Sequence, residues 1–135
     1  YRYHWHLHGE LDLGQMRLAA RRLIGEHDFK SFQAAGADRK TTVRTVRACD
    51  LIVPVVENDQ ASDLLIEVEA DGFLYNMVRN IVGTLVEVGR GKQTVEWIDQ
   101  VLHARDRDVA GPTAPACGLF LLWVDYPDSV LKLRE

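Results

Sequence analysis

The hydrophobic pattern is most regular across residues 64–91, where a strand, a turn and a helix follow one another. In residues 64–70, apolar side chains alternate with mostly acidic ones, which is typical of a strand with one buried face. Asp71 and Gly72 stop this strand, and we expect Asp71 to cap the helix that follows. Across residues 74–88, apolar side chains recur at spacings of three and four, which predicts an amphipathic helix.

Similar patterns predict the remaining elements. Alternating or β-branched runs predict strands over residues 1–8 and 43–56, and a continuous apolar run predicts a buried strand over 119–124. Helical spacing predicts a helix that Asp12 caps and Gly25 closes, and another that Thr94 caps, with its apolar side at Trp97, Ile98, Val101 and Leu102. About four strands interleaved with three helices favour an α+β fold. Its mostly antiparallel sheet would carry helices on one face, in a ferredoxin-like arrangement.

The first strand carries His4, His6 and His8 on one face. Three imidazoles at this spacing can converge on a metal ion, and a metal-dependent hydrolase is the corresponding function. No cysteine or acid follows at a familiar ligand spacing, so the polar face of an edge strand is the more economical interpretation. Glu26, His27 and Asp28 form a second cluster of titratable residues. Three consecutive residues cannot all point into one site, so we expect a capping and turn role.

Composition is ordinary for one globular domain: 135 residues, 47% hydrophobic and 27% charged. The net charge of -4 argues against broad nonspecific nucleic-acid binding but allows a local basic face. No apolar run is long enough for a bilayer, so no membrane association is expected. The two cysteines make no disulfide framework, which favours a reduced, cytoplasmic setting. Because the first residue is Tyr1 rather than methionine, we expect a piece of a longer protein.

Arg79 is the most informative charged residue. Tyr75 and Asn76 precede it by one helical turn and Gly83 follows by one turn, so all four share neighbouring surface. An arginine beside an aromatic ring and a mid-helix glycine could face a planar or anionic ligand, because such a glycine suggests close approach of something. On spacing alone, a solvated arginine on an amphipathic helix is the favoured alternative.

A basic cluster is the best candidate for contact with phosphate. It consists of Arg39, Lys40, Arg44 and Arg47, at the start of the strand predicted from Val43. A solvated strand-and-loop surface accounts for these residues equally well.

Three segments carry a resemblance to a known family: GEHDFKSF (25–32), GFLYNMVRNIVGTLVEVGRG (72–91) and RDRDVAGPTAPACGLFLLWVDYP (105–127). In order and spacing they resemble the C-terminal half of a TruA-type tRNA pseudouridine synthase. The resemblance implies isomerisation of uridine to pseudouridine in the anticodon stem-loop of tRNA, without cofactor or metal. It also implies a homodimer, with the tRNA lying across both protomers.

The resemblance also implies roles for individual residues. Arg79, in MVRN, matches the arginine that pairs with the catalytic aspartate, and Leu119, in GLFL, matches a position that lines the uracil pocket. Phe73, Tyr75 and Met77 would complete the substrate contacts, with the ordinary core as the alternative for Phe73, Met77 and Leu119. A flipped base needs such a pocket, and the basic cluster would hold phosphates without reading sequence.

The nucleophilic aspartate of the family lies in an arginine-threonine-aspartate-alanine-glycine-type motif, which this chain lacks. We therefore expect residues 1–135 to form a single C-terminal domain, inactive alone, whose N-terminal catalytic half is absent. The alternative is a non-catalytic RNA-binding or dimerisation module that keeps the fold.

Overall fold

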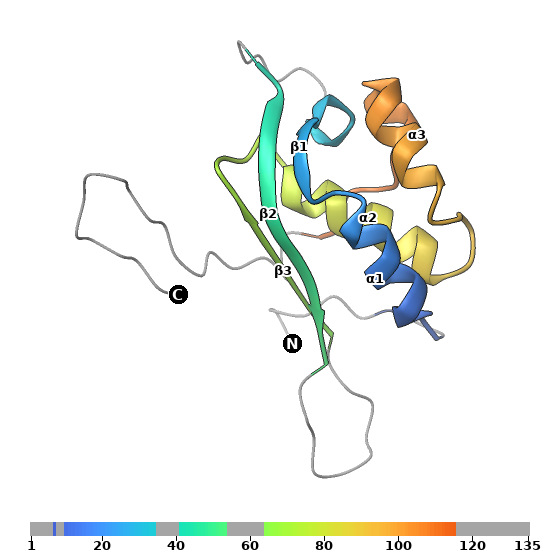
Figure 1. Ribbon diagram of the computed structural model, residues 1–135. Helices are drawn as coiled ribbons and strands as arrows, with labels where there is room; N and C mark the ends of the chain where they lie inside the picture. The colour runs from blue at the N-terminus through green and yellow to red at the C-terminus, as the bar shows by residue number, and fades with distance from the viewer. Residues whose placement is uncertain (1–6, 8–9, 35–40, 54–63, 116–135) are drawn as a thin grey trace, which may run out of the picture.

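The computed structural model describes residues 7, 10–34, 41–53 and 64–115. In these residues an antiparallel sheet carries three helices gathered on one side (Figure 1). The elements in chain order are α1 (Leu13–Arg21), β1 (Gly25–Asp28), η1 (Lys30–Phe32), β2 (Val43–Ile52), β3 (Leu65–Ala70), α2 (Met77–Gly89), α3 (Trp97–Ala104) and η2 (Arg107–Val109), where η marks a 3-10 turn. The α+β class is confirmed.

The sheet has the order β1-β2-β3, and both neighbouring pairs are antiparallel. Val46 pairs with Gly25 on one side and Ala70 on the other, and a bulge between Val46 and Ala48 shifts the register. The predicted strand over 119–124 lies outside the described residues. So does the predicted strand over 1–8, with its three histidines, except for Leu7, which belongs to no helix or strand. The structure adds a strand that was not predicted, β1, because its four residues are too few to show a period.

The core lies between the sheet and the helices. Its largest fully buried side chains include Met16 and Leu23 near α1, Phe29 and Phe32 around η1, and Met77, Ile81, Leu85 and Val88 of α2. The alternating apolar residues of β3 also pack against this cluster, as the pattern predicted. Each such side chain contributes about 1.5–3 kcal/mol when it leaves water, so α2 is held mainly by its packing.

Helix α2 is buried on more sides than its apolar stripe predicts. The predicted helix surface around Arg79 includes Gly83, yet Gly83 and its neighbours Asn80 and Thr84 are all buried. The reason is a contact from distant sequence: residues 110–114 return across this side of α2.

The predicted caps have mixed outcomes. Asp12 caps α1 as expected, because its Oδ1 accepts from the Gln15 N–H at 3.1 Å. The cap assigned to Asp71 is wrong: its Oδ1 accepts from the Thr45 N–H at 2.9 Å, which ties β2 to the turn after β3. Thr94 contributes its carbonyl oxygen to the Trp97 N–H at 3.2 Å, and Glu96 occupies the N-cap position of α3.

Helix α1 ends earlier than its pattern suggests. Ile24 is 41% exposed instead of continuing the apolar stripe, because the helix ends at Arg21 and the chain then turns. Gly25 makes this turn at φ 111°, in the left-handed region that favours glycine. By contrast, the predicted apolar side of α3 is confirmed, since all four of its residues are buried.

None of the helices within the described ranges combines the length and the apolar character needed to cross a lipid bilayer.

Candidate functional site

Arg79 lies in the first turn of α2 and is partly buried. Its Nε–H donates to the Ala114 carbonyl oxygen at 2.8 Å, and its Nη1 donates to Asn76 Oδ1 at 3.2 Å. Among the described residues, Nη2 has no hydrogen-bond partner. The guanidinium is therefore held by two protein oxygens, and within the described part of the chain Nη2 and one hydrogen of Nη1 have no acceptor and could donate to an anionic group.

The backbone at the start of α2 brings Asn76 to this position. Asn76 adopts φ 60°, a left-handed conformation that asparagine tolerates better than most residues. Leu74, just before it, is buried, and its carbonyl accepts from the Met77 N–H at 3.0 Å. Asn76 and Arg79 are three residues apart, so they face each other across one helical turn.

Residues 110–114, which we call the strap, lie directly on α2. A Cβ added at Gly83 would sit only 1.5 Å from the carbonyl oxygen of Pro112. Gly111 N donates to Thr84 Oγ1 at 3.0 Å, and Ala114 N donates to the Arg79 carbonyl at 3.0 Å. The mid-helix glycine thus does mark a close approach, and the approaching group is the chain's own backbone.

Beneath the strap lies a polar cluster that sequence reasoning missed. Asn80 is fully buried, donates to the Phe32 carbonyl at 2.7 Å, and accepts from Arg107 Nη2 at 3.0 Å and Thr113 Oγ1 at 2.6 Å. Nothing in the local pattern marks Asn80 or Arg107 as members of such a cluster, because Asn80 falls outside the apolar stripe of the helix and Arg107 lies in a charged run, residues 105–108. Two features of the sequence, taken together, could have indicated this cluster. Asn80 is a polar residue beside the apolar stripe of α2, and the strap consists of small and rigid residues that can lie close against a helix.

The predicted substrate residues fall into different environments. Phe73 and Tyr75 precede α2 and are 38% and 63% exposed, so neither ring is part of the core. Met77 is 1% exposed, which favours the core alternative for this residue. Leu119 lies outside the described residues.

The structure describes two of the four residues of the basic cluster, Arg44 and Arg47; Arg39 and Lys40 lie outside the described ranges. Arg44 Nη1 donates to the carbonyls of Thr41 and Val43, and its Nε would be 3.3 Å from a Cβ at Gly72. Arg44 is thus next to the turn that leads to Phe73. Arg47 donates through Nε to Glu69 Oε1 at 3.2 Å, so its charge already has a partner.

Two other candidate groups have structural roles. Asp28 Oδ1 accepts from the Lys30 N–H and the Thr42 hydroxyl, which fits the predicted turn role for this one residue, whereas Glu26 and His27 lie within strand β1 and not in a turn. Cys49 is buried in the core, where burial, with a smaller effect of Asp50, raises the pKa of its thiol to about 12. A thiol with that pKa stays protonated near neutral pH and acts as a small core residue.

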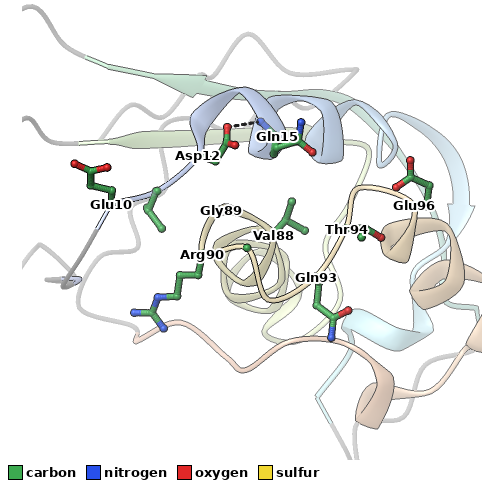
Figure 2. A pocket seen from close by; sticks show the side chains of 11 residues that line it. Glu10, Asp12, Gln15, Val88, Gly89, Arg90, Gln93, Thr94 and Glu96 are labelled. Atoms are coloured by element: carbon green, nitrogen blue, oxygen red, sulfur yellow. Dashed lines mark hydrogen bonds between the residues drawn. The ribbon is translucent and has the colours of Figure 1, made fainter.

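An open hollow of about 640 Å³ lies at the other end of α2, between its C-terminus and the start of α1 (Figure 2). Val88 and Arg90 line one side, and Asp12, Gln15 and Glu96 lie around it. Asp12 is already engaged as the cap of α1. Arg79 is not among its lining residues, so the hollow is separate from the candidate site.

Comparison with known proteins gives consistent matches. The model of the family described as tRNA pseudouridine synthase matches residues 19–127. Proteins named tRNA pseudouridine synthase A are 42% identical in Photobacterium profundum, 41% in Pseudoalteromonas atlantica and 43% in Aeromonas hydrophila. The alignments cover 90–92% of this chain and 43–45% of each relative. The chain therefore spans less than half the length of these relatives.

Proposed function

We propose, because this chain belongs to the tRNA pseudouridine synthase family, that it forms the C-terminal part of an enzyme that isomerises uridine to pseudouridine in the anticodon stem-loop of tRNA. The observation that carries the proposal is the guanidinium of Arg79. Two protein oxygens hold it, while Nη2 has no partner among the described residues.

Arg79 would pair with the nucleophilic aspartate supplied by the N-terminal half. A carboxylate nucleophile reacts best when it is ionised and oriented, and a guanidinium can do both through paired hydrogen bonds. In the isomerisation, the bond from C1′ to N1 of uracil breaks and a bond from C1′ to C5 forms. C5 loses a proton and N1 gains one, so the reaction consumes no oxidant or reductant and needs no cofactor or metal.

Residues near Arg79 would receive the target uridine. Phe73 and Tyr75 are exposed before α2, and Leu119 is assigned to the uracil pocket from its motif alone. Extracting a base from its stack costs a few kcal/mol, which aromatic and apolar contacts can offset. Arg44 and Arg47, with Arg39 and Lys40, would hold phosphates and position the tRNA.

The larger assembly is also part of this proposal. Residues 1–135 would be one C-terminal domain of a cytoplasmic homodimeric enzyme whose catalytic aspartate lies in the other half of the chain. The strand predicted over residues 1–8 and the apolar strand predicted over 119–124 would extend the described sheet in a ferredoxin-like arrangement. Support comes from the apolar run in residues 119–124 and from the fraction of each relative that the chain covers.

Tritium release tests this function directly. We expect the full-length protein to release tritium from tRNA labelled at uridine C5, because C5 loses its hydrogen when it bonds to C1′. The 135-residue chain alone should release none, since it lacks the aspartate motif. Release by the chain alone would reveal a nucleophile within it, and no release by the full-length protein would leave only the RNA-binding or dimerisation module.

Arg44→Ala in the full-length protein should weaken tRNA binding and lower the slope of log Kd against log salt by about 1, as expected for loss of one phosphate contact. Arg47→Ala should have a smaller effect, because Glu69 already pairs with Arg47. Arg90→Ala is the charge-matched control, since Arg90 is exposed beside the hollow at the other end of α2 (Figure 2). Equal slopes for Arg44→Ala and Arg90→Ala would remove Arg44 from the interface.

A further inference from the structure

The strap holds Arg79 from two directions. The carbonyl oxygen of Ala114 accepts from Arg79 Nε at 2.8 Å, while the N–H of Ala114 donates to the Arg79 backbone carbonyl at 3.0 Å. Ala114 itself is 5% exposed, so water has little access to these bonds. Any shift of the strap along α2 would therefore move the acceptor that orients the guanidinium.

The strap is held in turn by Arg107. Its Nη1 donates to the Gly111 carbonyl at 2.8 Å, and its Nη2 donates to Thr113 Oγ1 at 2.9 Å and Asn80 Oδ1 at 3.0 Å. The planar fork of arginine suits such an arrangement, because its donors have fixed directions. Arg107 thus joins Gly111 and Thr113 of the strap to Asn80 of α2.

Asn80 is the fixed point beneath this contact. Its Nδ2 donates to the Phe32 carbonyl, and its Oδ1 accepts from both Arg107 and Thr113. The residue is fully buried, so a lost partner could not be replaced by bulk water without opening the core. Among the described residues, the ion pairs are Arg22–Asp99 and Arg47–Glu69, and Arg107 is in neither. Its described hydrogen-bond partners are neutral oxygens.

We propose that Asn80, Arg107 and Thr113 are positioning residues, which fix the strap so that Ala114 aims the guanidinium of Arg79. The geometric consequence is that the Arg79 guanidinium keeps its orientation, and it does not depend on the function proposed above. The catalytic consequence is that this orientation speeds pseudouridine formation, and it rests on that function. The cluster acts on Arg79 through the strap and does not itself contact substrate.

Thr113→Val tests the geometric consequence, because it removes the hydroxyl that joins Arg107 to Asn80 while nearly preserving side-chain volume. The measurement is the solvent exchange rate of the Arg79 Nε–H, observed by NMR of the 135-residue chain. Thr113→Val should speed this exchange by about tenfold, because the protection of the Nε–H should fall by about the net free energy of one hydrogen bond. Thr113→Ser retains the hydroxyl and should restore a rate within about threefold of the original. Backbone amides of α2 should keep their protection.

Two outcomes would overturn the inference. One is an Arg79 Nε–H rate that Thr113→Val leaves unchanged; the other is faster exchange throughout α2, which would indicate a general role in stability. If Thr113→Val does not fold, Arg107→Lys replaces it, because an ammonium group cannot reproduce the fork to Gly111, Thr113 and Asn80. The same two outcomes then decide.

Turnover by the full-length protein tests the catalytic consequence separately. Thr113→Val should lower kcat for pseudouridine formation by about tenfold with KM for tRNA nearly unchanged, since misplacing a catalytic group affects the chemical step. Thr113→Ser should recover most of that loss. An unchanged kcat alongside faster Nε–H exchange would overturn the catalytic consequence. Absence of activity in the unmodified protein would instead refute the proposed function and leave the exchange result standing.

Discussion

Arg79→Ala in the full-length protein should lower kcat for pseudouridine formation by about a thousandfold, similar to the loss of a preorganised hydrogen-bond donor in other active sites. The physical reason is that Ala114 and Asn76 hold the guanidinium in advance, while Nη2, which has no partner among the described residues, would pair with the proposed carboxylate. Tritium release under saturating tRNA measures kcat, and filter binding measures Kd. We expect Kd to change by less than about threefold, because the role proposed for Arg79 lies in the chemical step.

Two further variants sharpen this prediction. Arg79→Lys keeps the charge but loses the fork, so it should remain far below the original activity if paired hydrogen bonds are what matters. Arg90→Ala removes an exposed arginine at the other end of the same helix and should retain full kcat. If Arg79→Ala weakens tRNA binding as much as it slows turnover, Arg79 is a phosphate contact, and its pairing with an aspartate is refuted.

Gly83→Ala should destabilise the chain by about 3 kcal/mol, the upper end of ordinary overpacking. An added Cβ would lie 1.5 Å from the Pro112 oxygen and 2.7 Å from the Pro112 carbonyl carbon, so strap and helix must separate. Backbone is the obstacle here, and it cannot rotate away as a flexible side chain could. The free energy of unfolding in urea measures the effect, with an unchanged m-value showing that the comparison is valid.

Gly14→Ala is the matched control for this substitution. Gly14 also lies in a helix, but its nearest new contact would be Asp12 Oδ1 at 3.5 Å, an ordinary van der Waals distance. Alanine there should be neutral or stabilise by up to about 1 kcal/mol through helix propensity. Similar stabilities for Gly83→Ala and Gly14→Ala would show that the strap does not lie against α2 in solution.

Local sequence patterns correctly predicted those features that depend on a single helix or strand. The alternation in β3 and the stripe of α2 follow from periodicity, and the cap at Asp12 follows from residue type and position. Asp71 shows the limit of such reasoning. A carboxylate just before a helical pattern is expected to cap that helix. Asp71 instead accepts a hydrogen bond from the N–H of Thr45, 26 residues away in sequence.

The candidate site was also predictable only in part, because its partners come from distant parts of the chain. Arg79 was identified because its motif resembles that of a known family, while its helical spacing alone favoured a solvated side chain. One of its described hydrogen-bond partners, Ala114, is 35 residues away and contributes a backbone oxygen, which no side-chain pattern can reveal. Likewise, the burial of Asn80 depends on Phe32, Arg107 and Thr113, which come from three other parts of the chain.

The order of synthesis gives the strap one more consequence. A ribosome synthesises α2 before residues 110–114, so in the emerging polypeptide Arg79 exists before the Ala114 oxygen that holds its guanidinium. The side chain takes up its final orientation only when translation has passed this point. A premature stop codon just after α3 would thus yield a product that contains Arg79 but lacks the Ala114 oxygen that orients its guanidinium.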